Sequence, residues 1–169
     1  MKKIILLLFL VLIPGMSQAA CDDPLTDGVD YTNCRFSDGQ DLQGSYLPNS
    51  NLSFASFIQV NFDKSIMMNS ILAFGTFSES SFIRANLYEA NLQGGNFELS
   101  NFSSSNLTKA NFQGSTLIGA NFKNANLIDA NLTSANIIDA NFEGANLNNT
   151  IWIDGNKCLA GSIGLCKKE

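Results

Sequence analysis

A strict five-residue period runs through most of this 169-residue chain. Counting in steps of five from position 42 to position 152 reaches 23 central positions without an insertion, and none of them is polar. Eleven are Leu and nine are Phe, while the preceding residue is Asn fourteen times. A period of five fits neither an α-helix nor a β-strand. Fixed self-similarity of this kind predicts a solenoid.

Aromatic residues add a second, longer period, because Phe recurs at every fourth central position. One column of central positions contains Phe62, Phe82, Phe102, Phe122 and Phe142, and the neighbouring column contains Phe57, Phe77 and Phe97. A third column contains Leu87, Leu107, Leu127 and Leu147 and has no Phe. We expect four pentapeptides in each coil, with these side chains as the structural core. Rings stacked in a column resist slippage of one coil past another.

Each position of the pentapeptide has a predicted role. The central residue points inward, and so does the small residue two before it, where a larger side chain would collide with neighbouring coils. The Asn between them suits a turn, because its short amide bonds to nearby backbone, and stacked Asn side chains also bond to one another. The two residues after each centre point outward.

At the level of individual repeats the chain resembles the pentapeptide repeat family. Residues 85–89 (Ala-Asn-Leu-Tyr-Glu) and 125–129 (Ala-Asn-Leu-Ile-Asp) follow that family's A-(D/N)-L-x-x pattern. The resemblance implies an all-β fold, a right-handed quadrilateral parallel β-helix with four pentapeptides per coil. At four pentapeptides per coil, the 23 repeats form about six coils, which are expected to lie about 4.8 Å apart.

The N-terminus carries the features of a secretory signal. Lys2 and Lys3 precede ten apolar residues, 4–13, too few to span a bilayer as a helix. Small residues at Ser17 and Ala19 indicate cleavage after Ala19, and hence a periplasmic or secreted protein without a membrane span. The alternative is lipoprotein anchoring through Cys21, although Gln18 occupies the position where that motif normally has Leu.

Four cysteines remain after the signal, and an even number in an exported chain indicates disulfides. In a rod-shaped solenoid the cysteines at opposite ends cannot meet, so Cys21 is expected to pair with Cys34 and Cys158 with Cys166. A metal site is disfavoured, because the chain has no His and no Cys-x-x-Cys spacing. The predicted organisation is a signal peptide (1–19), an N-terminal cap (20–39), the repeat solenoid (40–154) and a C-terminal cap (155–169).

The composition offers little for catalysis. There is no His, and the disulfides leave no free thiol, so a nucleophile and its base cannot be assembled. Glu79 and Glu98 face outward on the same side, one coil apart, and are interpreted as solvated surface acids. We expect no enzyme activity, no catalytic or metal-binding residues and no cofactor.

A protein contact is the more promising use of the outward positions. Ile118 and Ile138 stack in adjacent coils, next to a face with Ile128, while Phe54, Phe74 and Tyr88 also face outward. These six residues are the candidate interaction surface, for an unknown protein partner or for self-association. The less regular residues Tyr46, Ile66 and Ile71, which replace Asn, are interpreted as tolerated irregularities.

An alternative function follows from the family resemblance. Some members protect DNA gyrase by presenting an acidic rod that mimics DNA. The net charge here is −5, and removal of Lys2 and Lys3 leaves 8 basic against 15 acidic residues, or −7. That acidity opposes nucleic-acid binding, yet no outward column is acidic throughout. The sequence therefore favours a non-enzymatic exported structural or protein-interaction module over a DNA mimic.

Overall fold

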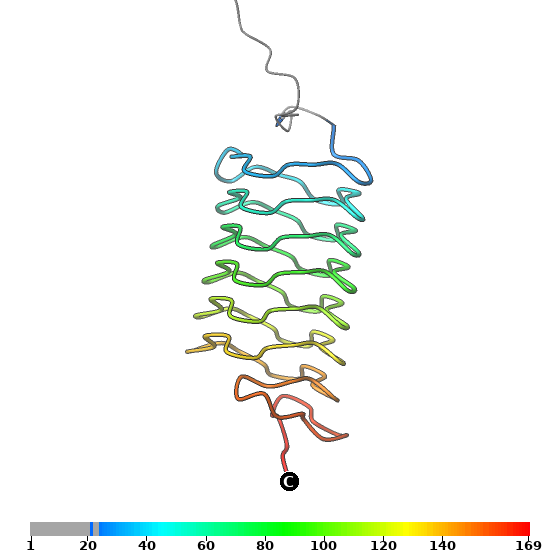
Figure 1. Ribbon diagram of the computed structural model, residues 1–169, viewed down its shortest axis with the longest axis vertical. Coiled ribbons are helices and arrows are strands. Elements are labelled where there is room, and N and C mark those ends of the chain that lie inside the picture. The colour runs from blue at the N-terminus through cyan, green and yellow to red at the C-terminus, as the bar shows by residue number, and fades with distance from the viewer. Residues whose placement is uncertain (1–20, 22–23) are drawn as a thin grey trace, which may run out of the picture.

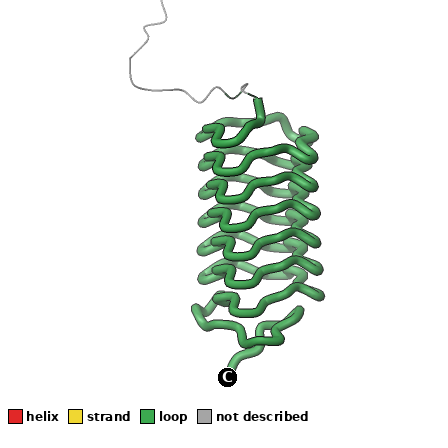
Figure 2. Tube along the Cα trace, turned by 90° about the vertical axis from the view of Figure 1, so that its right-hand side faces the viewer, coloured by secondary structure: helices red, strands yellow, loops and turns green. Residues whose placement is uncertain are grey.

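The computed structural model describes residue 21 and residues 24–169. The signal segment and its cleavage site lie outside the described residues. The described chain forms a rod of stacked coils that runs from the N-terminal to the C-terminal end (Figure 1). Within it there is no helix and no extended strand, and Figure 2 accordingly shows turns and loops throughout. No helix of the described part is therefore long and apolar enough to cross a membrane.

Single parallel β-bridges join each coil to the next. From Asp41↔Asn61 to Asn131↔Ile151, every parallel bridge connects a residue to the one four pentapeptides later, so each coil consists of four pentapeptides. The bridges fall at the residue before each central position. The N–H of a central residue then donates to the following coil, as in the 2.8 Å bond from Leu87 N to Asn106 O. Backbone pairing between coils replaces the hydrogen bonds that strands would make.

Columns of stacked rings fill the interior. Phe62, Phe82 and Phe102 are fully buried, with ring centroids 5.1 and 4.8 Å apart and nearly parallel planes. The neighbouring column is in edge contact with the first, because the Phe57 and Phe62 rings meet at 66° with centroids 5.2 Å apart. Each buried ring or Leu side chain contributes about 1.5–3 kcal/mol through burial.

Asparagines before the central residues hold the backbone in two ways. Asn86 Oδ1 accepts a hydrogen bond from the N–H of Tyr88, two residues later, at 3.3 Å. The same oxygen accepts a 3.0 Å bond from Asn106 Nδ2 in the next coil. The predicted turn role and the predicted side-chain ladder are both present at this residue.

The N-terminal end continues the aromatic core beyond the regular repeat. Phe36 stacks on Phe57 with ring centroids 4.1 Å apart, and Tyr31 contacts the edge of the Phe36 ring. The bridge Arg35↔Ser56 encloses one residue more than a regular coil. The predicted disulfide between Cys21 and Cys34 is formed.

The C-terminal end is closed by a segment that turns back on the last coil. Two antiparallel bridges, Asn146↔Ile163 and Ile151↔Lys157, replace the parallel ones. The predicted Cys158–Cys166 disulfide holds this segment, and closing such a loop contributes about 2–3 kcal/mol. An ion pair and hydrogen bond with Lys168 lowers the pKa of Asp154 to about 2.

Buried serines divide into satisfied and unsatisfied hydroxyls. Ser80 Oγ donates to Phe57 O at 2.6 Å and accepts from Val60 N at 3.0 Å, so it bridges a turn whose own backbone bond is missing. Ser65 Oγ is equally buried and has no hydrogen-bond partner among the described residues. The hydroxyl of Ser80 is therefore expected to stabilise the fold, whereas the hydroxyl of Ser65 is not.

This difference gives a paired prediction. Replacing Ser80→Ala leaves the Phe57 carbonyl and the Val60 N–H unpaired and should lower the free energy of unfolding by about 1–3 kcal/mol. Ser65→Ala removes an unsatisfied hydroxyl and should be neutral or stabilising. Urea unfolding followed by circular dichroism measures both, and equal losses for the two variants would contradict the assignment.

Candidate interaction surface

Turns expose the two residues that follow each centre. The second of them adopts a left-handed backbone conformation around the rod, as at Phe54 (φ 59°), Leu99 (φ 56°) and Asp139 (φ 57°). Its side chain points away from the core, while the residue before it is typically half-buried. The outward positions expected from the sequence are therefore the surface of the rod.

Phe54 and Phe74 form an exposed aromatic pair. Their rings stack with centroids 5.4 Å apart, and each residue remains more than half exposed, at 57% and 53%. Phe74 also lies over Gly94 in the next coil, where an added Cβ would come within 2.6 Å of two ring carbons. The glycine thus provides the space in which the ring rests.

Ile118 and Ile138 lie in adjacent coils, as expected, and a third apolar residue joins them. Gly119 N donates to Ile138 O at 2.9 Å, and Leu99 N donates to Ile118 O at 2.8 Å. The Leu99 side chain lies over Gly119 and is 57% exposed. We call Leu99, Ile118 and Ile138 the apolar strip. It spans three successive coils.

Tyr88 is engaged in a polar cluster. Lys109 Nζ lies 5.4 Å from the centre of the Tyr88 ring, donates to its hydroxyl at 3.1 Å and forms a 2.8 Å ion pair with Glu89. Hydrogen bonds from Lys109 and Tyr88 lower the pKa of Glu89. Hydrogen bonds to Glu89 and Tyr88 raise the pKa of Lys109. The cluster occupies the surface that Tyr88 would offer to an apolar partner.

Ile128 does not lie next to the strip. It is half-buried and two pentapeptides from Ile118, which is half of a four-pentapeptide coil. Its carbonyl instead accepts from Lys109 N, on the part of the coil that carries Tyr88. The expected neighbourhood of Ile118 and Ile128 was wrong, because one step around the coil takes one pentapeptide and these two residues are two pentapeptides apart.

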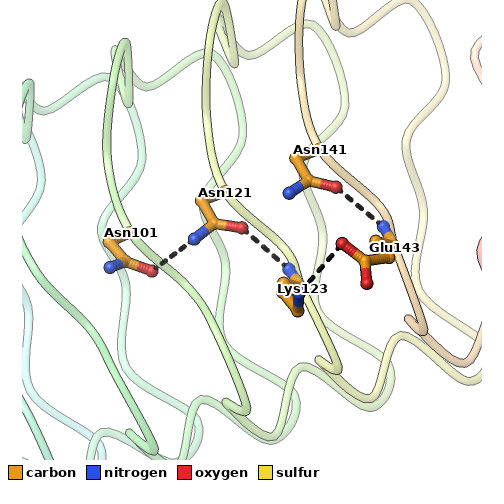
Figure 3. A network of polar contacts seen from close by, with 5 residues as sticks. All are labelled: Asn101, Asn121, Lys123, Asn141 and Glu143. Carbon is orange, nitrogen blue, oxygen red and sulfur yellow. Dashed lines mark hydrogen bonds and ion pairs between the residues drawn. The ribbon is translucent and has the colours of Figure 1, made fainter.

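A polar surface follows the apolar strip along the coil. Asn121 donates to Asn101 and accepts from the backbone N–H of Lys123, and Lys123 Nζ forms a 2.9 Å ion pair with Glu143 (Figure 3). Asn141 binds the Glu143 backbone in the same way. The charged side chains of this surface are paired with each other, whereas exposed apolar side chains lie in the strip and at the Phe54–Phe74 pair.

The two surface acids Glu79 and Glu98 lie on adjacent coils. The backbones of Glu79 and Glu98 are joined by a 2.8 Å hydrogen bond, and the Glu79 carboxylate accepts from Gln59 Nε2 at 2.9 Å. Across the described residues no group of three His, Cys, Asp or Glu side chains could hold a metal ion. Two surface hollows lie at opposite ends of the rod, one beside Leu25 and Phe36 and the other beside Lys157 and Leu159.

Comparison with protein families accounts for the repeat. The pentapeptide repeat family model matches eight copies in residues 41–72, 80–117 and 117–151, more than half of the chain. The chain belongs to the pentapeptide repeat family. The cysteine-stapled ends lie outside the matched residues. A search of curated proteins finds no match.

Two solved structures illustrate the matches to this chain, and the first of them shares its fold. Full-length QnrB1, a plasmid-mediated fluoroquinolone resistance protein, has a TM-score of 0.68 at 19% identity, covering 73% of this chain and 65% of that one. This chain therefore spans under two thirds of QnrB1. HetL from Nostoc sp. strain PCC 7120, involved in heterocyst differentiation regulation, has a TM-score of 0.30 at 16% identity, covering 78% and 92%.

Several exposed apolar residues were not singled out in advance. Leu99 was not among the predicted surface residues, although its outward position follows from the five-residue count. Tyr46 and Ile71 occupy positions usually taken by Asn, and the structure leaves both exposed. Ile163 and Leu165 are also exposed, in the C-terminal segment, where no repeat exists to predict their direction.

The glycine under Phe74 gives a testable contrast. Gly94 and Gly114 occupy equivalent turns with φ of 63° and 66°, but only Gly94 has a ring over it. Gly114→Ala should cost about 1–2 kcal/mol for a left-handed alanine. Gly94→Ala should cost about 0.5–1.5 kcal/mol more, because it also displaces Phe74. Equal destabilisation of the two variants in thermal unfolding would show that the contact between Phe74 and Gly94 does not contribute to the stability of the fold.

Proposed function

We propose that this protein is an exported, non-enzymatic module that binds another protein through the apolar strip. Its rod is a right-handed quadrilateral β-helix, in which the four pentapeptides of a coil make the four sides. The single observation that carries the proposal is the alignment of exposed Leu99, half-buried Ile118 and exposed Ile138 over three successive coils. Isolated exposed apolar side chains are common on proteins, whereas a contiguous strip indicates a contact site.

An exported location is supported by the two disulfides. Both ends of the rod are stapled, by Cys21–Cys34 and Cys158–Cys166, and no cysteine of the described residues remains free. Disulfides form and persist in oxidising compartments and are rare in the cytosol. They agree with the signal expected in residues 1–19, and they favour the periplasm or the medium as the place where the partner is found.

Rigidity supports a binding role for the side of the rod. Consecutive coils are bonded at every pentapeptide and the core rings are stacked, so the strip residues are held at fixed spacing. A preorganised surface loses little conformational freedom on binding. The polar surface with Lys123 and Glu143 has its charges paired and should stay solvated, which restricts the partner to the apolar side.

The test is affinity capture from periplasm and medium with the mature protein as bait. The Ile118→Lys/Ile138→Lys double variant places two charges in the apolar strip. It should lose the captured partner or, if the contact is self-association, elute at a different volume from the parent protein. Ile128→Lys is the matched control, since it adds a charge half a coil away and should behave as the parent. Unchanged partners and elution for the double variant would rule out the strip as the contact.

A gyrase-directed DNA mimic is the second candidate, favoured by the shared fold with the resistance protein QnrB1. Two surface acids of the described residues are neutralised by bases one coil away, Glu89 by Lys109 and Glu143 by Lys123. A DNA-like surface needs uncompensated charge. Tight binding of the mature protein to purified gyrase would replace the strip proposal with this one.

A further inference from the structure

The C-terminal segment covers only half of the last coil. Its antiparallel bridges reach Asn146 and Ile151, and Leu147 N donates to Ser162 O at 2.8 Å. The preceding half, residues 136–144, is bridged to the coil before it through Asn136 and Asn141 but has no bridge to the described residues on its other side. Gly164 of the C-terminal segment lies against the backbone of residues 142–144, so the open backbone edge of the solenoid runs along residues 136–141 and ends at the N–H of Phe142.

Hydrogen bonds one coil earlier show what this edge lacks. Leu117, Gly119 and Phe122 donate their N–H groups to the last coil at 2.7–2.9 Å. Their equivalents one coil later are Ile137, Asp139 and Phe142. The N–H groups of these three residues donate no hydrogen bond to any described residue. Neither do the carbonyls of Ala135 and Ala140 accept a hydrogen bond from any of them. Donors and acceptors of a parallel ladder are thus presented together.

Side chains along the edge are correspondingly open. Ile137 and Ala140 are half-buried, whereas their equivalents Leu117 and Ala120 are fully buried one coil earlier. Ile138 is 61% exposed beside the unpaired N–H groups. An unpaired edge with apolar side chains is a ready template for another chain.

We propose that this edge binds a linear segment of a partner protein, which follows the turned path of a coil and adds one more rung to the solenoid. Main-chain hydrogen bonds to Ile137, Asp139 and Phe142 give such a segment its affinity, while one inward apolar side chain covers Ile137 and one outward apolar side chain covers Ile138. The proposal goes beyond the apolar strip, because it uses the end of the rod and the backbone.

Charge and shape select the occupant. The Asp139 carboxylate is exposed and forms no ion pair or hydrogen bond with the described residues, so a Lys or Arg in the segment complements it. A second copy is disfavoured, because a two-fold pairing of this short edge brings two Asp139 carboxylates together. The C-terminal segment also projects beyond the last coil along the rod (Figure 1), so it would meet an approaching rod end first.

The experiment selects a phage-displayed library of random linear twelve-residue peptides on the purified protein. Enriched peptides should contain apolar residues together with Lys or Arg. Titrating one of them into the labelled protein should shift the amide resonances of Ile137, Asp139 and Phe142 and slow their hydrogen exchange. The corresponding amides of Leu117 and Phe122 are protected already and should not change.

Variants separate this edge from the apolar strip. Ala140→Lys places a charge on the open edge and should weaken the peptide at least tenfold, and Asp139→Asn should weaken it several-fold. Ser134→Lys is the matched control, because Ser134 N is already bonded to Ile153 O at 2.9 Å. Ile118→Lys alters only the strip and should leave peptide binding unchanged.

Three results would overturn the proposal. They are the absence of enriched peptides, peptide-induced shifts confined to Leu99 and Ile118, and protection of the edge amides by self-association without peptide. The second of these results would support the strip and reject the edge. Loss of the captured partner in Ile118→Lys, with normal peptide binding by the same variant, would support both sites independently, because Ile118 belongs to the strip alone whereas Ile138 belongs to both sites.

Discussion

Each inward side chain packs against an equivalent side chain one coil away, and the remaining features of the molecule depend on that repetition. The Phe102 and Phe122 rings lie 5.1 Å apart with an interplanar angle of 5°, which is offset stacking at nearly the spacing of paired strands. The backbone bridges hold the same spacing. Core and backbone therefore impose one register, and every outward residue inherits a fixed place on the surface.

Those features that follow from the repeat could be predicted from the sequence. The recurrence of Phe62, Phe82 and Phe102 at every fourth pentapeptide matches the coil length in the structure, because stacked aromatic columns require it. The disulfides were predictable for a related reason: a rod keeps Cys21 and Cys166 apart, so each cysteine must find its partner locally. In both cases a single physical constraint, ring stacking for the coil length and rod shape for the disulfides, allowed only one arrangement.

The rest depended on contacts that a five-residue count does not contain. Whether a buried serine is satisfied depends on its coil neighbour, and Ser80 and Ser65 have opposite outcomes at equivalent positions. The extent of the C-terminal cover was equally hidden, since residues 155–169 have no period from which to read it. The two candidate contacts differ in this respect. Ile118 and Ile138 of the apolar strip could be named from the five-residue count, whereas the open edge depends on how much of the last coil the C-terminal segment covers.

The central claim is that the four-pentapeptide coil, rather than the five-residue repeat alone, determines the packing. Deleting residues 86–105 removes one whole coil and joins Ala85 to Asn106, whereas deleting residues 86–100 removes three pentapeptides and joins Ala85 to Asn101. Both deletions preserve the five-residue period. Thermal unfolding followed by circular dichroism should show a cooperative transition near that of the parent for the first. The second should melt at a much lower temperature, because Phe102 would fall under Met67 instead of Phe82. Equal melting temperatures for the two deletions would contradict the account.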